Sequence, residues 1–163
     1  MVRLGTVADA SALADIYNHY IRETAITFDL HPRSVAEQAA WCEQFASAAR
    51  HKLLVAERDG ALAGFACSTA FRTKAAYDTT VETTVYVAPD AVGQGVGTAL
   101  YGALLDALAG EDIHRAIAAI TPPNPASVAL HERFGFRHVA TLDEVGRKFD
   151  RYHDVLWYEK RMR

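Results

Sequence analysis

The chain has 163 residues and a mass of 17.9 kDa, and 50% of its residues are apolar while 23% are charged. These values are typical of one globular domain with a sizeable core, so we expect residues 1–163 to form a single domain. Seventeen basic against twenty acidic residues give a formal net charge of −3, which excludes the basic surface that nucleic-acid binding requires.

The first half of the chain predicts strands and helices in alternation. Apolar residues recur at helical spacing behind Asp9, a candidate cap, and Ser34 with Glu37 forms the S-x-x-E capping box of a second helix. The pair Asp59-Gly60 favours the tight turn of a β-hairpin. In chain order we expect a strand at 2–6, helices over 12–20 and 35–49, a hairpin of strands 53–58 and 62–71, and a strand over 80–87.

The second half continues the alternation. Residues 142–151 show no clear periodicity, and no repeat or linker interrupts the sequence. Alternating elements of this kind predict an α/β domain with a mixed sheet and helices on both faces. The expected elements are a helix over 98–109, a strand over 116–121, a helix over 126–134 and a terminal pair of strands at 137–142 and 155–160.

The two cysteines, Cys42 and Cys67, lie in apolar contexts without metal-ligand or redox spacing. We interpret them as reduced core thiols, not as a disulfide or a catalytic thiol. No apolar run has the length of a membrane span, and the first residues do not have the pattern of a signal peptide. We therefore expect a cytoplasmic protein that binds neither membrane nor nucleic acid and acts on small molecules.

A glycine-rich loop follows the strand at 80–87 and opens the next helix. A strand, a glycine loop and a helix in this order usually present backbone N–H groups to a phosphate. Gly93, Gly95 and Gly97 do not match the dinucleotide pattern G-x-G-x-x-G, whose last position holds Thr98, and no P-loop lysine precedes that threonine. The loop alone is therefore consistent with a pyrophosphate site or with a simple tight turn.

A second segment, NPASVALHERFGF at 124–136, decides between these alternatives. Together with the glycine loop it resembles the acetyl-CoA site of the GNAT superfamily of N-acetyltransferases, although Val92 stands where that superfamily usually has Arg or Gln. Segments at 18–28, 71–78, 81–89 and 152–160 are similar to the phosphinothricin and methionine sulfoximine N-acetyltransferases within it. The residues that match the second motif are Asn124, Ser127, His131, Glu132, Gly135 and Phe136.

The resemblance implies a fold and a set of partners. The fold would be a mixed, mostly antiparallel sheet that is splayed between two central parallel strands, with helices on both faces. Acetyl-CoA would be the co-substrate, no metal would be needed, and a small amino acid would be acetylated by direct attack of its amine on the thioester. A homodimer is also expected, with Trp157 and Tyr158 as candidate interface residues. The alternatives are acetylation of a peptide N-terminus or a polyamine, and a non-catalytic acyl-CoA-binding module.

The attacking amine needs a base, because most of it is protonated at neutral pH. Strand alternation places Glu82, Thr84 and Tyr86 on one face, where Glu82 is either a solvated carboxylate or, as the resemblance implies, the base. A backbone N–H near Val87 would donate to the carbonyl oxygen of the thioester. His131 would protonate the departing thiolate or, if neutral, hold a water or a substrate oxygen; a structural role is the alternative.

The resemblance also implies the remaining binding residues. Arg72 and Lys74, which share a face by strand alternation, would pair with an acidic group of the substrate, or form a solvated strand end. Phe28 and Tyr77 would be walls of the substrate pocket, or part of the core. The candidate coenzyme-binding residues are Val85, Val87, Gly93, Gln94, Gly95, Val96, Gly97, Thr98, Asn124 and Ser127.

Overall fold

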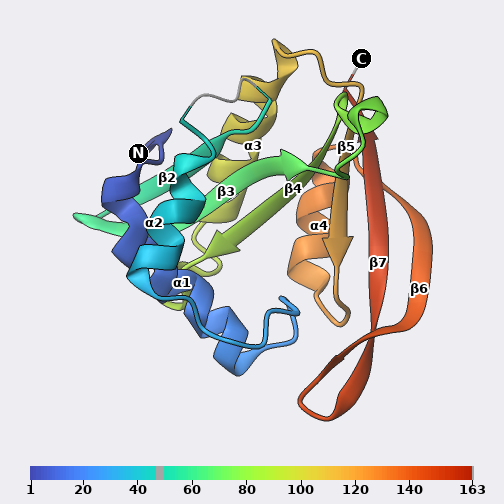
Figure 1. Cartoon of the computed structure of the whole chain (residues 1–163), viewed down its shortest axis with the longest axis horizontal. Coiled ribbons are helices and arrows are strands. Elements are labelled where there is room, and N and C mark those ends of the chain that lie inside the picture. Colours follow the sequence, from blue (N-terminus) through green and yellow to red (C-terminus); the bar gives the residue numbers. More distant parts are fainter. Residues whose placement is uncertain (47–49, 163) are drawn as a thin grey trace.

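The computed structural model describes residues 1–46 and 50–162, which build a seven-stranded mixed sheet between two layers of helices (Figure 1). The spatial order of the strands is β1-β2-β3-β4-β5-β7-β6. The elements are β1 (Val2–Leu4), α1 (Ala10–Glu23), α2 (Val35–Glu43), β2 (Leu53–Arg58), β3 (Ala61–Ala70), β4 (Thr80–Val87), α3 (Val96–Ala109), β5 (Arg115–Ile120), α4 (Pro125–Arg133), β6 (Arg137–Lys148) and β7 (Arg151–Arg161), with short 3-10 turns η1 (Val7–Asp9), η2 (Ala75–Tyr77) and η3 (Pro89–Ala91).

The sheet opens in its middle, as expected. All neighbouring strands are antiparallel except β4 and β5, which run parallel and pair only at three positions, Thr80 with Arg115, Val81 with Ala116 and Glu82 with Ile117. Beyond this point the two strands diverge, which Figure 1 shows between the green β4 and the gold β5. Half of the backbone of β4 therefore faces a gap where a neighbouring strand would otherwise lie.

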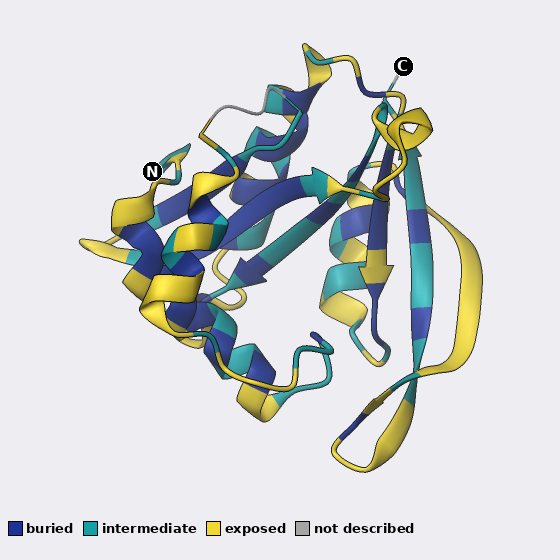
Figure 2. Cartoon of the chain, viewed as in Figure 1, coloured by how far each residue is buried: buried dark blue, intermediate teal, exposed yellow. Residues whose placement is uncertain are grey.

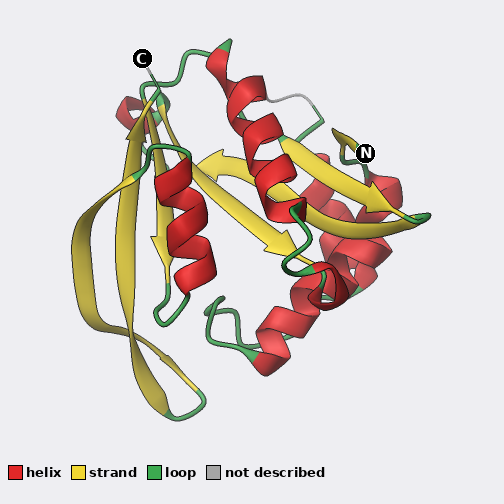
Figure 3. Cartoon of the chain, turned by 180° about the vertical axis from the view of Figure 1, so that it is seen from behind, coloured by secondary structure: helices red, strands yellow, loops and turns green. Residues whose placement is uncertain are grey.

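The helices cover opposite faces of the sheet and enclose a continuous apolar core. α1 and α2 pack together on one face, while α3 and α4 lie on the other, which Figure 3 shows from behind. Leu100, Tyr101, Leu104 and Leu108 of α3 are fully buried. Figure 2 shows the buried parts of the strands and helices in dark blue. Among the residues that the structure describes, no helix is long and apolar enough to cross a membrane.

Local signals were good predictors of where the helices begin. The capping box at α2 is present, because the Ser34 Oγ accepts the Glu37 N–H at 3.2 Å and the Glu37 carboxylate accepts the Ser34 N–H at 2.7 Å. α2 ends at Glu43, earlier than expected, and positions 47–49 of the expected helix lie outside the described residues. Asp9 precedes α1, but its carboxylate does not cap that helix; it accepts the Thr6 N–H at 2.8 Å and pairs with Arg3 at 2.7 Å.

The largest difference from the sequence-based expectation is the hairpin of β6 and β7. Residues 142–151 belong mostly to these two strands, so the expected strands at 137–142 and 155–160 were too short. The first nine residues of β6 are exposed, and the pairing shifts twice along this edge strand. A strand without a buried face needs no alternation of apolar and polar residues, which explains the missing periodicity.

Candidate active site

A large cleft lies where β4 and β5 part, on the side of α3 and α4. Its volume is about 830 Å³. The Ala88 N–H bonds to the Ala63 carbonyl at 2.8 Å, so by the antiparallel alternation the N–H and C=O groups of Val85 and Val87 point away from β3 and into the gap. The Tyr20 hydroxyl donates to the Val87 carbonyl at 2.6 Å, and no strand of the described residues lies opposite the Val85 groups. β4 can therefore pair here with an extended ligand as it would with a strand.

The glycine loop closes one end of this cleft. Gly93 and Gly95 have φ of +79° and +81°, a left-handed conformation that disfavours residues with a side chain. α3 begins at Val96 without a side-chain cap and without an acidic residue in its first turn. The first N–H groups of a helix lack partners within it and lie at the positive end of its dipole, so this helix start can bind an anion.

The candidate coenzyme-binding residues lie around this helix start and the cleft, with one exception. Val85, Val87, Gly93, Gly95, Val96, Gly97, Thr98, Asn124 and Ser127 line the cleft, whereas Gln94 does not. The Gln94 side chain folds back and donates to the Asp90 carbonyl at 2.7 Å. Val92, at the position that usually carries a cation in the superfamily, is exposed at the same rim.

His131 of α4 is buried beside the cleft, and its hydrogen bonding shows which ring nitrogen carries the proton. Its Nδ1 lies 2.7 Å from the Ser127 carbonyl, which can only accept, so Nδ1 carries the proton. The ring packs edge-on against Tyr101 and Phe136, and Nε2 is buried without a hydrogen-bond partner among the described residues. Burial lowers the pKa of His131, so the neutral ring presents an unpaired acceptor.

The same helix positions the other two motif residues. Asn124 caps α4, because its Oδ1 accepts the Ser127 N–H at 3.2 Å. The Ser127 hydroxyl lies 3.3 Å from the Nδ1 of His131. Asn124 and Ser127 thus build the start of the helix that holds His131, and both also line the cleft.

A smaller cavity of about 310 Å³ lies on the opposite face of the sheet, beside α1 and α2. It is lined by Glu82, Thr84 and Tyr86 of β4, in agreement with the expected alternation. The two cavities share the lining residues Ile26, Thr84, Tyr86, Ala119 and Thr121. They therefore meet at the split between β4 and β5, where a group on one face can reach a group on the other.

Glu82 is the half-buried carboxylate of the smaller cavity. Burial raises its pKa, and the Arg72 guanidinium partly counteracts this effect. No hydrogen bond to the Glu82 carboxylate is found within residues 1–46 and 50–162, so both oxygens are available to a ligand. A carboxylate whose pKa is raised toward neutrality and that borders a cavity is suited to accept a proton.

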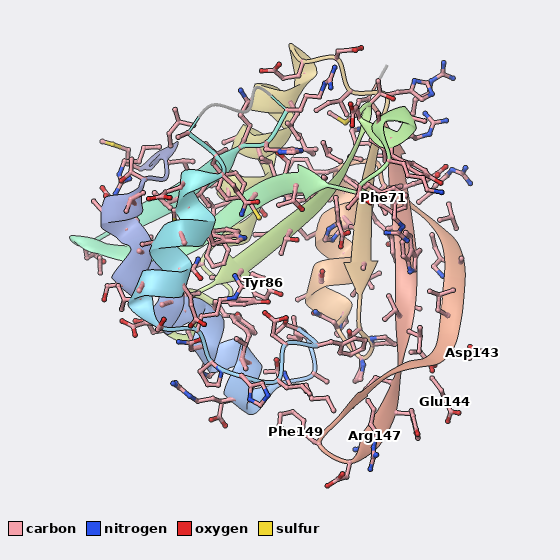
Figure 4. All side chains as sticks on the ribbon, viewed as in Figure 1. Phe71, Tyr86, Asp143, Glu144, Arg147 and Phe149 are labelled. Atoms are coloured by element: carbon pink, nitrogen blue, oxygen red, sulfur yellow. The ribbon has the colours of Figure 1, made fainter. Side chains whose placement is uncertain are left out.

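The expected substrate residues are distributed unevenly. Phe28 lines the smaller cavity, whereas Arg72, Lys74 and Tyr77 are exposed outside it. The strand argument for Arg72 and Lys74 was wrong, because β3 ends at Ala70 and both residues lie in the turn that precedes η2. Arg72 instead stacks on Phe71, 4.2 Å from the ring centroid, at the end of β3 that Figure 4 labels. Its charge nevertheless acts on Glu82.

The hairpin of β6 and β7, which is longer than the sequence predicted, holds Phe28 in place. Gly146 lies so close to Phe28 that a Cβ there would come within 2.1 Å of the ring. The buried Lys148 ammonium donates to the Thr27 carbonyl at 2.7 Å, and the His153 ring lies 6.1 Å from that of Phe28. A wall of the smaller cavity thus depends on contacts between residues more than 100 positions apart.

Among the lining residues that sequence reasoning missed are three with polar side-chain groups, Tyr20, Arg33 and Gln38. Tyr20 lines the cleft, while Arg33 and Gln38 line the smaller cavity. Arg33 and Gln38 stand at polar positions around the start of α2 that read as solvent-exposed, and Tyr20 reads as one of several apolar residues of α1. No local pattern distinguishes these residues, because their role comes from packing against β4.

A mixed sheet that opens between its two parallel strands, beside a helix turned by glycines, is the architecture of the GNAT N-acetyltransferases, and the chain belongs to this family. The sequence model of the protein family described as the acetyltransferase (GNAT) family matches residues 13–136, which extend from α1 to the residue before β6. The expectation drawn from the two sequence motifs is thereby confirmed. The chain is an N-acetyltransferase of the α/β GNAT class.

Individual relatives match over almost the whole chain. The phosphinothricin N-acetyltransferase of Streptomyces coelicolor is 53% identical over 161 residues, which cover 98% of this chain and 94% of that protein. The L-methionine sulfoximine/L-methionine sulfone acetyltransferase of Pseudomonas aeruginosa is 31% identical over 158 residues, or 97% of this chain and 92% of that protein. The solved structure of the phosphinothricin acetyltransferase of Sinorhizobium meliloti in complex with acetyl-CoA is 29% identical in sequence and superposes with a TM-score of 0.93. The match covers 99% of this chain and 87% of that chain.

Proposed function

We propose that this chain transfers the acetyl group of acetyl-CoA to the α-amino group of a small amino acid. Phosphinothricin, methionine sulfoximine and methionine sulfone are the proposed substrates, as the names of the relatives suggest. The observation that carries the proposal is the position of Glu82 in a small cavity that meets the larger cleft through the split sheet. A base on one face can thus serve an acyl donor bound along the other face.

The cleft residues fit the proposed coenzyme. The buried, unpartnered Nε2 of His131 and the unpaired backbone of Val85 are groups that a bound molecule can satisfy. Pyrophosphate would lie at the uncapped start of α3, where Gly95 and Val96 present N–H groups, and the pantetheine amides would pair with β4. When bound, acetyl-CoA supplies the activated acyl group.

The chemistry of the transfer follows from the charges around Glu82. Glu82 takes the proton from the substrate ammonium group and leaves a neutral amine, and the raised pKa of its carboxyl makes it a better-matched base. The Val87 N–H, directed into the gap, donates to the carbonyl oxygen on which negative charge develops. As the C–N bond forms and the C–S bond breaks, the second proton released by the amine nitrogen passes to the departing thiolate. His131, held neutral by burial, acts as a hydrogen-bond acceptor and not as the proton donor to the thiolate.

We further propose that the enzyme is a cytoplasmic homodimer that uses neither metal nor nucleic acid. No group of side chains in the described part of the chain could hold a metal ion. Exposed apolar side chains of the hairpin, among them Val139, Val145 and Phe149, are better interface candidates than Tyr158, which is only 4% exposed. Figure 4 shows Phe149 at the turn of this hairpin. β6 is also an edge strand with one unpaired side, which a second copy can cover.

The test is thiol release from acetyl-CoA with the purified protein and a panel of amines. The panel contains phosphinothricin, methionine sulfoximine, methionine sulfone, methionine, spermidine and a peptide with a free N-terminus. We expect saturable turnover with the three named amino acids. Turnover with spermidine or the peptide alone would contradict the proposed substrate class, and binding of acetyl-CoA without any turnover would contradict the proposed activity.

The Glu82→Gln variant tests the base. We expect kcat/KM to fall by a factor of about 10² to 10⁴, because the neutral amide cannot accept the proton. Glu23→Gln makes the same chemical change at the exposed end of α1 and serves as the control. Near-normal turnover by Glu82→Gln over the whole pH range would remove Glu82 from the reaction.

A further inference from the structure

Gln38 is a buried amide whose oxygen has no partner. The residue is 1% exposed, and its Oε1 makes no hydrogen bond to any residue that the structure describes. It lies on the face of α2 that also carries Trp41 and Cys42 toward the sheet, and it lines the smaller cavity. Burying an amide without a partner costs free energy, which an apolar residue at this helix position would avoid. The cavity is therefore where the partner of this amide has to come from.

Arg33 presents a cation to the same cavity. Its guanidinium lies 4.6 Å from the centroid of the Tyr17 ring and 5.9 Å from that of Trp41, and Nη2 pairs with Asp29 at 2.9 Å. The Nε and Nη1 groups form no hydrogen bond with the described parts of the chain. An arginine that is stacked on a ring and held by one nitrogen is pre-organised to bind a polar ligand with the others.

The cavity thus has a carboxylate and a cation at separate places. Glu82 and Tyr86 are four residues apart on β4, which corresponds to about 13 Å between their Cα atoms. Tyr17, on which Arg33 stacks, packs against Tyr86, with 5.1 Å between the ring centroids. Arg33 therefore belongs to the Tyr86 end of the cavity, and Figure 4 shows Tyr86 at the end of β4, away from Phe71. Between these ends the wall includes Cys67 of β3 and Thr84 of β4, which lie opposite each other and carry no charge.

We propose that Arg33 and Gln38 determine specificity by binding the far end of the substrate side chain. The proposal rests on the proposed function, in which Glu82 receives the α-amine. The group they fit carries oxygens that accept hydrogen bonds, such as a phosphinate, a sulfone or a sulfoximine, at the end of a short aliphatic chain. Arg33 donates to one oxygen, and the Gln38 amide, which has both a donor and an acceptor, pairs with the other oxygen or with an N–H of the same group.

The experiment compares methionine sulfone with methionine, which lacks the oxygens. We expect the wild-type protein to prefer the sulfone, and both Gln38→Leu and Arg33→Met to reduce the ratio of the two kcat/KM values by about 10- to 100-fold, because each removes a bond made only to the oxygenated group. Arg22→Met, at an exposed position of α1, is the matched control and leaves the ratio unchanged. Gln38→Leu should also raise the melting temperature, since the buried amide is gone.

The outcomes separate this inference from the proposed function. An equal loss for both substrates, or an unchanged ratio in both variants, would overturn the role of Arg33 and Gln38 while acetyl transfer stands. If the wild-type protein acetylates neither compound, calorimetric titration with the two amino acids decides: tighter binding of the sulfone that Arg33→Met abolishes supports the inference, and equal binding overturns it. Arg33→Met and Gln38→Leu are read independently, so a folding failure of one variant leaves the other decisive.

Discussion

Replacement of Gly95 by alanine tests the glycine loop, and Gly60 offers a matched control. Both glycines have a φ of +81°, and a Cβ at either position would meet no atom within 4 Å. The two substitutions therefore impose the same backbone strain without any steric clash. Only Gly95 lies at the start of α3 beside the cleft, because Gly60 is in the turn between β2 and β3.

The magnitude follows from the backbone conformation. An alanine in the left-handed region costs about 1–2 kcal/mol, from which about 0.4–1 kcal/mol is recovered because the unfolded chain is less flexible. We expect each variant to lose about 1 kcal/mol of unfolding free energy, or about 2–4 °C in melting temperature for a chain of this length. In Gly95→Ala the loop can relieve this strain by changing its conformation. Binding of acetyl-CoA then has to restore the original conformation, which weakens the affinity by up to about fivefold.

Two measurements check this prediction. Chemical denaturation gives the unfolding free energies of Gly95→Ala and Gly60→Ala, and calorimetric titration gives their affinities for acetyl-CoA. We expect similar stability losses and a weaker affinity in Gly95→Ala alone. Refutation would come from an affinity that falls equally in both variants, or from a Gly95→Ala protein that keeps both its stability and its affinity.

Three further predictions concern charges and a buried hydrogen bond. Arg72→Met removes the cation that lowers the pKa of Glu82, so we expect the acid limb of the profile of kcat/KM against pH to move to higher pH. The control Arg22→Met, at an exposed position, should leave this limb in place. An acid limb that does not move in Arg72→Met would contradict the effect of Arg72 on Glu82. The pKa of His131 is lower in the folded than in the unfolded chain, so its contribution to stability is complete above about pH 6.5 and is lost as the pH falls through the folded value. His131→Leu should therefore flatten the acid-side slope of unfolding free energy against pH, and identical slopes would exclude a buried neutral ring. Tyr101→Phe should lower the free energy of unfolding, measured by chemical denaturation, by about 1 kcal/mol. The loss is small because Thr83, whose hydroxyl lies 2.7 Å from that of Tyr101, retains its hydrogen bond to the Ile117 carbonyl. A loss beyond about 3 kcal/mol would show that the Thr83 hydroxyl is left without a hydrogen bond.

Features encoded by neighbouring residues could be read from the sequence. The capping box of α2, the turn at Gly60 and the glycine loop each depend on conformations or hydrogen bonds within a few residues. The limits of β4 were predicted to the residue, because this strand has a buried face and ends at a Pro-Asp turn. The split of the sheet after Glu82 was implied only by resemblance to a family, since no property of an isolated strand reports whether it has a neighbour.

Features that depend on distant packing could not be read in this way. Gln38 looks like a surface residue of an amphipathic helix, and only its place over the sheet shows that it is buried. The strand expected at 62–71 ended within one residue of the observed end of β3 at Ala70. Strand alternation was nevertheless extended to Arg72 and Lys74, because no glycine or proline marks the turn before η2. The pairing of Phe28 with Gly146 joins segments that carry no common pattern, and it forms only when the hairpin folds back.

The opening of the sheet also has mechanical consequences. β1 to β4 form one half-sheet and β5, β7 and β6 another, and within the described residues strand pairing joins the two halves only at Thr80–Glu82 with Arg115–Ile117. Next to this short seam, the Thr83 hydroxyl donates to the Ile117 carbonyl at 3.2 Å and lies 2.7 Å from the Tyr101 hydroxyl. A ligand that pairs with Val85 and Val87 closes the seam, so it couples the halves and slows hydrogen exchange at these amides. Rigidity of the fold thereby becomes a function of coenzyme concentration.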